Sequence, residues 1–511
     1  MSEQGTYMKG HGKQNRQAIL TTSTVNNNED EKKRILEDYT QWKKTAPVLY
    51  DMVITHNLTW PTLTCQWLPK RSIENGFVKQ ELLIGTHTND EEDNYAQYLD
   101  IDIPEKGLDT PEEQKTKMYI TQQICHQGEV NKARYQPHQP DIFATKTRDG
   151  DVLVFDRTKP QTETCEPMLR LKGHEMEGYG LAWNPHISKK NHLLSAGFDN
   201  LICHWDIGIT PNNDRELQPY QRYEGHTGCV EDVSWNSAND SLFASVADDM
   251  KLMIWDSRDP AKPAQRVQAH QGEINSVAFH PNKDWMLATG SSDKTVGLFD
   301  IRKIDTKLHS MELHEGEITQ VAWSPHDDPI LASAGTDRRI VVWDLRHIGQ
   351  EQTPEDAEDG PPEIMFVHSG HTSRISDFSW NPTDRWVLAS AAEDNVVQIW
   401  QMNSLYCSED CLRSDALNHH PLLGYDYAEL KDFPRSSASP TLTATSSSTA
   451  SFSPLASPIP SLKEPPTFNL NNNEESLYQH IYQRKQQEQQ GKKKSPIYLH
   501  SSYNFQKHDI F

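Results

Sequence analysis

The sequence is poor in positive charge. Its 511 residues contain 50 Lys and Arg against 73 Asp and Glu, which gives a formal net charge of −23. Binding the phosphate backbone of nucleic acids requires clustered Lys and Arg side chains, so this balance argues against direct, sequence-specific nucleic-acid binding. An acidic surface instead favours a basic partner.

Cysteine and long apolar segments are also scarce. The seven Cys residues are odd in number and lack paired metal-ligand spacing, and Cys407 and Cys411 alone do not make a zinc site. No stretch reaches the apolar length of a membrane span, and the N-terminus lacks a signal-peptide core. We therefore expect a soluble intracellular protein with reduced thiols, no cofactor, no metal and no membrane contact.

What the sequence does contain is a spaced pattern of residues, repeated six times. Each copy has a His, an aromatic residue nine positions later, a Ser or Thr at about nineteen, an Asp at twenty-three and Trp or Phe at twenty-nine. The His residues are His126, His174, His226, His270, His314 and His371, and the closing aromatics are Phe155, Trp205, Trp255, Phe299, Trp343 and Trp400. Only the second copy slips, by two residues after Trp183.

The pattern resembles the WD40 repeat, in which each copy of about 45 residues builds one four-stranded propeller blade. Apolar runs within the copies are strand-like, for example Leu242–Val246 followed by Leu252–Trp255, with the turn residue Asp248 between them. Hairpins are the natural connection between such runs. Each blade is therefore expected to be an antiparallel sheet.

The resemblance also implies a hydrogen-bonded chain within each blade, formed here by His226, Ser245, Asp249 and Trp255 and by their counterparts. A His, a Ser and an Asp also suggest a protease, but a catalytic triad is one activated nucleophile at a solvent-facing site. A set repeated six times inside blades is better explained by buried polar groups that satisfy one another. Copies ending in Phe155 and Phe299 lack the indole donor and should have weaker networks.

Residues Tyr50–Ile103 are expected to supply a seventh, degenerate blade, in which His56 is followed nine positions later by Cys65. The run Leu49–Thr55 lies where the outer strand of the blade ending at Trp400 belongs in a closed ring. An N-terminal strand would thus close the ring and remove exposed sheet edges. The predicted fold is an all-β, seven-bladed WD40 β-propeller with an N-terminal α-helix and a disordered C-terminal tail.

The predicted segments are a disordered N-terminus at 1–27, a helix at 28–46, the propeller at 47–406 with an acidic Pro-Pro loop at 350–363, and a low-complexity Ser/Thr/Pro-rich tail at 407–511. The composition of the tail cannot bury enough apolar surface to order itself. Its Ser-Pro pairs are candidate phosphorylation sites. Lys492–Lys494 fit a weak nuclear-import signal or a merely solubilising charge run equally well.

The helix is predicted from a capping box at Asn28 and Glu31 and a Pro47 just beyond its end. Its apolar face contains Ile35, Tyr39 and Trp42. Because the helix precedes the ring, this face must pack on the outside of the propeller or on a partner. A helix merely docked on the ring explains Trp42 equally well.

The acidic loop is found from the repeat spacing. The next His follows the closing Asp by 14 positions at Asp256–His270 but by 27 positions at Asp344–His371. The insertion is acidic and rich in Pro, and it leads into Ile364–Val367, which we expect on the outer edge of the last blade, beside the helix. A solvated excursion is the alternative. An apolar helix face beside a stiff acidic loop would suit an amphipathic helix with basic residues on one side.

Several strings resemble the Msi-type, retinoblastoma-binding WD40-repeat histone chaperones, a family that includes the small subunit of chromatin assembly factor and subunits of histone acetyltransferase and deacetylase complexes. They include Trp42-Lys43-Lys44, Leu49-Tyr50-Asp51, Trp60-Pro61-Thr62-Leu63-Thr64 and Pro354-Glu355-Asp356-Ala357-Glu358-Asp359-Gly360-Pro361-Pro362. The similarity extends from about Lys33 to Tyr406. Family members hold the first helix of histone H4 between the helix and the loop. The resemblance assigns this groove to Ile35, Leu36, Tyr39, Glu355, Asp356, Glu358, Asp359, Phe366 and Leu405.

A second site is predicted at one mouth of the channel, three and five positions after each repeated His. Four of the six positions at plus three are Glu, which predicts an acidic annulus rather than residues chosen for solubility. The family uses this face for extended Arg- and Lys-bearing peptides such as the tail of histone H3. The matching residues are Glu129, Asn131, Glu177, Tyr179, Glu231, Asn275, Glu317, Arg374 and Glu393. Thr319 departs from the family, which usually has an aromatic residue there.

The resemblance predicts a non-catalytic adaptor for histones H3 and H4 in chromatin assembly, acetyltransferase, deacetylase or methyltransferase complexes. We expect a monomeric propeller within these hetero-complexes, located in the nucleus, with the cytoplasm as a second location. Trp255-Asp256-Ser257-Arg258 and Trp343-Asp344-Leu345-Arg346 suggest the alternative of a substrate receptor for a cullin-type ubiquitin ligase. An enzyme is disfavoured because the sequence has no nucleophile elbow, phosphate loop or metal-ligand spacing.

Overall fold

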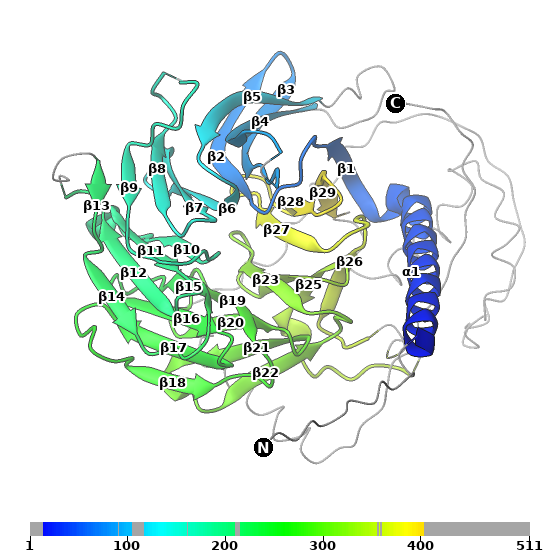
Figure 1. Cartoon of the computed structure of the whole chain (residues 1–511). Helices are drawn as coiled ribbons and strands as arrows, with labels where there is room; N and C mark the ends of the chain where they lie inside the picture. The colour runs from blue at the N-terminus through cyan, green and yellow to red at the C-terminus, as the bar shows by residue number, and fades with distance from the viewer. Residues whose placement is uncertain are drawn as a thin grey trace, which may run out of the picture. The chain divides into compact units, whose positions relative to one another are not determined.

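The computed structural model describes residues 14–402 except 90, 105–116, 161, 210–214, 355–356 and 358–359, with side chains from residue 31 onward. Within these ranges a long helix, α1 (Gln14–Leu49), is followed by strands that form seven sheets around a central axis (Figure 1). We number the sheets as blades. None of the described helices is long and apolar enough to cross a membrane.

The first three blades follow the order of the chain. Blade 1 contains β6 (Val130–Gln136), β7 (Gln139–Thr147), β8 (Val152–Asp156) and β9 (Leu169–Leu171), and β13 (Glu216–Leu217) pairs with β9 in parallel as a fifth strand. Blade 2 contains β10 (Leu181–Trp183), η1 (Ile187–Lys189), β11 (His192–Ala196), β12 (Leu201–Asp206) and β14 (Gln221–Glu224). Blade 3 contains β15 (Val230–Trp235), β16 (Leu242–Ala247), β17 (Lys251–Asp256) and β18 (Gln265–Gln268).

Blades 4 to 7 complete the ring, and the last two contain the strands from the beginning of the chain. Blade 4 contains β19 (Ile274–Phe279), β20 (Met286–Ser291), β21 (Thr295–Asp300), η2 (Ile301–Lys303) and β22 (Lys307–Glu312). Blade 5 contains β23 (Ile318–Trp323), β24 (Ile330–Gly335), β25 (Ile340–Asp344), η3 (Leu345–His347) and β26 (Ile364–His368). Blade 6 contains β27 (Ile375–Trp380), β28 (Val387–Ala392), β29 (Val396–Met402) and β1 (Tyr50–Asn57). Blade 7 contains β2 (Cys65–Glu74), β3 (Phe77–Gly85), β4 (Asn94–Pro104) and β5 (Lys117–His126).

The ring is closed by a strand from the beginning of the chain. β1 pairs antiparallel with β29, and Val53 lies opposite Trp400. Blade 7 then follows directly from β1, as the degenerate copy predicted. The seven-bladed propeller is therefore confirmed, including the N-terminal strand that completes the last blade and removes its open edge.

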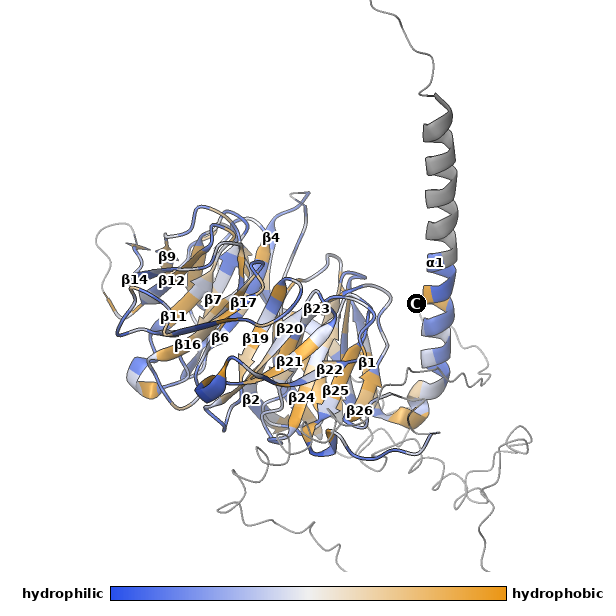
Figure 2. Cartoon of the chain, turned by 90° about the horizontal axis from the view of Figure 1, so that it is seen from below, coloured by the Kyte–Doolittle hydropathy of each residue, from blue (hydrophilic) through white to orange (hydrophobic). Residues whose placement is uncertain are grey.

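Apolar side chains fill the space between neighbouring blades. The second and third strands of a blade, such as β16 and β17, are buried along most of their length. Figure 2 shows hydrophobic residues, in orange, along many of the strands. Between blades 2 and 3, for example, Leu194 and Ile202 pack with Trp235 and Phe243. Each blade is thus held by its two neighbours, and the core is divided among the interfaces rather than gathered at one centre.

The hydrogen-bonded chain predicted for each repeat is complete in blades 3 and 5. In blade 3, His226 Nδ1 donates to Asp249 at 3.0 Å, Ser245 Oγ donates to His226 Nε2 at 2.7 Å, and Trp255 Nε1 donates to Ser245 Oγ at 2.8 Å. Burial raises the pKa of Asp249, but the hydrogen bonds from His226 and the Thr227 N–H outweigh it and hold that pKa below its ordinary value.

The other four copies are incomplete, each for a visible reason. Phe155 and Phe299 supply no donor, as predicted, and His126 Nδ1 donates to the Gly128 carbonyl at 2.8 Å instead of to an Asp. In the copy that slips by two residues, Trp205 Nε1 is buried and lacks a hydrogen-bond partner among the described residues. In blade 6 the distance from His371 Nδ1 to Asp394 grows to 3.6 Å.

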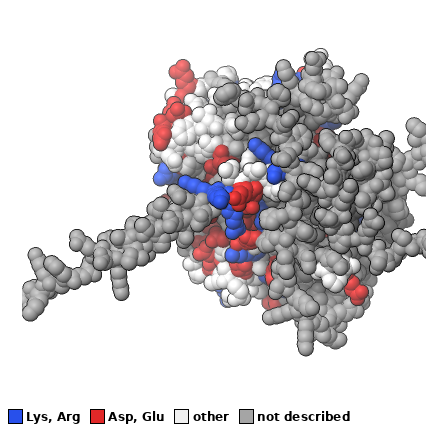
Figure 3. Space-filling view, turned by 90° about the vertical axis from the view of Figure 1, so that its right-hand side faces the viewer, with Lys and Arg blue, Asp and Glu red and all other residues white. Residues whose placement is uncertain are grey.

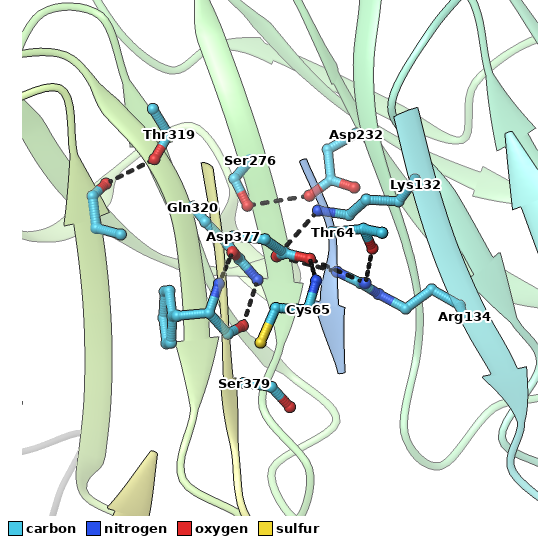
Figure 4. Close-up of polar contacts among 12 residues, drawn as sticks. Thr64, Cys65, Lys132, Arg134, Asp232, Ser276, Thr319, Gln320, Asp377 and Ser379 are labelled. Atoms are coloured by element: carbon cyan, nitrogen blue, oxygen red, sulfur yellow. Dashed lines mark hydrogen bonds and ion pairs between the residues drawn. The ribbon is translucent and has the colours of Figure 1, made fainter. Parts of the chain in front are cut away.

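A second repeated feature, which the sequence reasoning missed, lies six positions after each repeated His. In blades 3 to 6 the side chain there accepts a hydrogen bond from a backbone N–H of the next blade (Figure 4). These acceptors are Asp232, Ser276, Gln320 and Asp377, and Thr64 does the same between blades 7 and 1. The corresponding residues of blades 1 and 2 are Lys132 and Gly180, which have no acceptor to offer.

The helix is longer than predicted. It runs from Gln14 to Leu49 instead of 28–46, so the capping box at Asn28 lies inside it and Pro47 is in its last turn. Residues 14–27 contain neither Pro nor Gly, so a helix nucleated by packing further along can propagate back through them. The missing N–H of Pro47 frees only the Lys43 carbonyl, close to the carbonyls that any helix end leaves unpaired.

The strand after the acidic loop lies in a different blade from the one that the sequence predicted. β26 pairs with β25 and is the outer strand of blade 5, whereas the outer strand of blade 6 is β1. The reason is the offset built into the repeat, because the outer strand of each blade precedes the His of the next copy. The predicted neighbourhood survives, since blades 5 and 6 are adjacent and Phe366 on β26 lies 5.1 Å from Tyr50 on β1, ring centre to ring centre.

Candidate functional site

The C-terminal half of α1 is fixed to the rim of the propeller by Trp42. This side chain is buried at 9% exposure, and its Nε1 donates to the Tyr50 hydroxyl at 3.0 Å. The Tyr50 hydroxyl also lies 2.8 Å from His368 Nδ1 on β26. Helix, closing strand and the outer strand of blade 5 therefore meet at one buried polar contact.

The predicted groove residues of the helix lie beside this contact. Tyr39 stacks on Trp42 with ring centres 5.5 Å apart, and Ile35 is half-buried one turn earlier. Leu36, in contrast, is 63% exposed. Phe366 is half-buried and stacks on Trp400 at 5.9 Å. An aromatic row thus runs from the helix to blade 5, with an uncovered Leu at its edge.

Ion pairs link exposed charged residues of the helix to blade 5. Asp38 pairs with Arg338 at 3.2 Å, and Glu315 lies between Arg34 at 3.4 Å and Arg339 at 3.3 Å. Figure 3 shows Lys and Arg interleaved with Asp and Glu on this face of the molecule. Such exposed pairs contribute little stability, but they orient the helix along the rim.

The acidic loop leaves and rejoins blade 5 at a defined base. Gln352 Nε2 donates to the Gly360 carbonyl at 3.0 Å, and the buried Glu363 lies 2.8 Å from His309 of blade 4. Gly360 has a φ of +118°, which favours glycine. Glu355, Asp356, Glu358, Asp359 and Leu405 lie outside the described residues.

The second predicted site lies on the upper face, which we define as the face where the inner strands begin. Asn131 Nδ2 donates to Glu177 at 3.1 Å, which links blades 1 and 2. Asn275 Nδ2 donates to the Ile318 carbonyl of blade 5 at 2.8 Å. Burial raises the pKa of Tyr179, and the carboxylates of Glu177 and Glu231 raise it further, so these groups face the same region.

The acidic annulus is not uniform. Glu129 is buried at 2% exposure, accepts a hydrogen bond from the Asn89 N–H, and pairs with His87 at 3.2 Å and Arg148 at 3.5 Å. Arg374 pairs with Glu393 at 2.5 Å. The annulus is therefore partly neutralised, because basic side chains pair with Glu129 on blade 1 and with Glu393 on blade 6. Glu317 remains exposed.

Glu231 is chemically unusual among these carboxylates. Burial, followed by the nearby charges of Asp248, Asp232 and Glu273, raises its pKa to about 8. A Lys or Arg bound beside Glu231 would favour its ionised form and so lower this pKa. Asp248, which the sequence reasoning did not select, stands directly before the network residue Asp249, and that adjacency was the available signal.

Two family models match the sequence of the chain. Residues 217–256, 261–300, 305–344 and 363–401 match the family model of the WD domain, G-beta repeat, which places the protein among the WD40-repeat propellers. Residues 37–105, from the middle of α1 into blade 7, match the model described as histone-binding protein RBBP4 or the C subunit of the CAF1 complex. The chain belongs to the Msi-type, retinoblastoma-binding family of WD40-repeat histone chaperones and is a histone-binding adaptor.

The Trp-Asp-x-Arg strings that suggested a ubiquitin-ligase receptor have a local explanation. Arg258 pairs with its own Asp256 at 2.6 Å, and Arg346 pairs with Asp344 at 2.6 Å. Each Asp also accepts the backbone N–H of its Arg. The spacing is thus accounted for by a capped turn after the third strand, without a ligase partner.

Proposed function

We propose that this histone-binding protein holds the first helix of histone H4 in a groove between α1 and the acidic loop at 350–363. The observation that carries the proposal is Leu36, which is 63% exposed although it lies beside the aromatic row that anchors the helix. An amphipathic helix could bury this Leu against its apolar side. The loop carboxylates Glu355, Asp356, Glu358 and Asp359 would then pair with its basic side.

On the upper face we propose a separate site for extended cationic peptides, including the tail of histone H3. Glu177, Tyr179, Glu231 and Glu317 supply its polar contacts. The net charge of −23 supports a basic ligand. Two separate sites would let one propeller carry H3 and H4 together.

We infer that the protein serves as a non-catalytic subunit of chromatin assembly and histone-modifying complexes in the nucleus, as a monomeric propeller. The geometry of the repeated His, Ser and Asp supports a structural role for them. Ser245 is fully buried, and its Oγ already accepts the indole N–H of Trp255. A substrate carbonyl cannot reach an oxygen enclosed in this way.

The groove is tested by capture of a synthetic H4-helix peptide on the full chain. Reversing the charge at Glu355, Asp356, Glu358 and Asp359 should abolish capture, and Leu36→Asp should weaken it, with the thermal midpoint nearly unchanged because Leu36 is exposed and charged side chains are rarely buried. Controls are Glu163→Lys with Glu166→Lys, and Ile73→Asp, which alter exposed residues on blades 1 and 7. Capture that survives both groove variants would refute the proposal.

The upper face is tested by Glu231→Lys, which places a cation where a cationic peptide should bind. Affinity for an H3-tail peptide should fall while H4-helix capture is unchanged. Fluorescence anisotropy with each peptide in turn measures both. Equal loss of both affinities would indicate misfolding rather than a separate site.

A further inference from the structure

An apolar patch stands at the edge of the upper face on blade 2. Met176 is 52% exposed, and Tyr179 and Phe198 are half-buried with their ring centres 5.8 Å apart. Phe198 lies in the turn between β11 and β12, and its N–H donates to the Glu177 carbonyl at 2.8 Å. This bond ties the turn to the loop that carries Met176, so the three side chains are held together.

Blade 5 has Thr319 where the family usually has an aromatic residue. Thr319 of blade 5 directs its hydroxyl at backbone, donating to the Ile375 carbonyl at 3.1 Å and the Ala334 carbonyl at 3.3 Å. Thr319 therefore offers a ligand only a small side chain whose hydroxyl is already hydrogen-bonded to the backbone. The aromatic surface available to an upper-face ligand lies on blade 2 instead.

Acidic groups border this patch on both sides. Glu177 directly follows Met176 in the chain, and Glu231 is the second residue of β15, the inner strand of blade 3. Blade 3 reaches the patch through Cys229, whose Sγ lies 3.6 Å from the Phe198 carbonyl. A single exposed Met is ordinary on a protein surface. An exposed Met beside two half-buried rings and two carboxyl groups, however, offers one ligand both an apolar contact and an acidic contact.

We propose that Met176, Tyr179 and Phe198 form an anchor for a large apolar side chain of the peptide bound on the upper face, next to a Lys or Arg held by Glu177 and Glu231. The proposal rests on the proposed upper-face function and adds a sequence preference to it. The ligand is an extended cationic peptide in which a Leu, Met or aromatic residue neighbours the cation. Apolar contact determines which peptide binds most tightly, and the acidic groups attract all cationic peptides alike.

The experiment uses the full chain and two sets of fluorescent ten-residue peptides with identical Lys and Arg residues. One set carries Leu beside the Lys, before it or after it, and the other carries Ser at the same position. One Leu peptide should bind about fivefold tighter than its Ser counterpart, as expected when an apolar side chain is partly removed from water. Met176→Ser and Phe198→Ser should each reduce this ratio toward one without changing affinity for the Ser peptide.

Ile187→Ser is the matched control, because Ile187 is 68% exposed in η1, after the inner strand rather than before it, and should leave the ratio intact. Circular dichroism and the thermal midpoint confirm that each variant is folded. Equal binding of the two sets by the wild-type chain, or a ratio that survives both anchor variants, would overturn the anchor alone. Failure of the wild-type chain to bind either set would overturn the upper-face function and the anchor with it.

Discussion

At the scale of single residues, a hydroxyl shared by the His and the Trp is the centre of the network in blades 3 and 5. Ser245 receives the indole of Trp255 and donates to His226, so one oxygen satisfies two buried partners. The ionised Asp249 requires that the proton of the imidazole be on Nδ1, which leaves Nε2 as an acceptor. In blade 4 the same place is taken by Thr289, which bonds His270 but receives no indole N–H because Phe299 has no donor.

Ser245→Ala should therefore cost more than removal of the equivalent hydroxyl in blade 4. Two buried groups lose their partner, at about 1–3 kcal/mol each. Thr289→Val, which keeps the shape of the side chain, leaves one group unpaired and is the matched control. Urea unfolding measures both free energies, and equal losses would show that the indole contributes nothing to the chain.

The buried His residues predict a pH dependence of stability. Burial lowers the pKa of His126 to about 4, against about 6.5 in an unfolded chain. Its contribution is complete above pH 6.5 and is lost as pH falls to 4, because only the unfolded state binds the proton in that window. His126→Gln should flatten the decline of unfolding free energy between pH 6.5 and 4 by up to about 3 kcal/mol.

The measurement is urea unfolding at half-unit steps of pH. His280, whose pKa burial also lowers to about 4, should give the same flattening when changed to Gln. A slope that neither substitution alters would mean that these rings are protonated in the folded protein.

At the scale of elements, α1 combines a buried anchor and an exposed edge within two turns. Trp42 packs against Tyr50 and His368, whereas Leu36 is left to solvent. The sequence could place Tyr39 and Trp42 on one face, since spacing alone decides this. It could not tell that the helix begins at Gln14, because a capping box is a local preference that packing elsewhere can override.

Trp42→Ala should detach the helix from the rim. The substitution removes a large buried side chain and its hydrogen bond to Tyr50, which costs about 3–5 kcal/mol locally. Proteolysis within α1 should become faster while the propeller keeps its β-sheet circular dichroism. Lys43→Ala, an exposed neighbour, is the control, and protection of α1 that persists in Trp42→Ala would show that the helix is held by its ion pairs instead.

The strands were the most predictable elements, and pairing between distant segments the least. The repeat spacing located β16, β17 and the closing strand β1, because each blade reuses one pattern. The place of β26 in blade 5 follows from the same repeat offset, although the prediction put it in blade 6. The parallel pairing of β13 with β9 has no such pattern behind it. The neutralisation of Glu129 by Arg148 and His87 was likewise invisible, since Arg148 occupies a turn position that varies among the copies and His87 lies in the degenerate copy.

At the scale of the whole molecule, Asp377 joins three blades around the channel. Fully buried on blade 6, it accepts the Cys65 N–H of blade 7 at 2.8 Å and pairs with Lys132 and Arg134 of blade 1 at 3.1 Å (Figure 4). Burial raises the pKa of Asp377, but these two cations outweigh burial and hold that pKa below its ordinary value. The cluster lies where the first and last blades of the ring meet.

Asp377→Ala should be among the most damaging single changes in the chain. It leaves two cations without their counter-ion in the channel wall, and breaking a buried pair in this way costs about 3–5 kcal/mol. Glu37→Ala, which removes an exposed partner of Lys33, should cost less than about 1 kcal/mol. Thermal unfolding compares the two, and similar midpoints would mean that water readily replaces Asp377.

The closing pair β1 and β29 also has a consequence for biosynthesis. A ribosome makes Tyr50–Asn57 early and Val396–Met402 more than three hundred residues later, so β1 must wait for its partner throughout that interval. Until Met402 emerges, β1 has no partner strand. A truncated mRNA that ends before that codon therefore yields a propeller that cannot close. Quality control by chaperones is thus most needed while this protein is being translated.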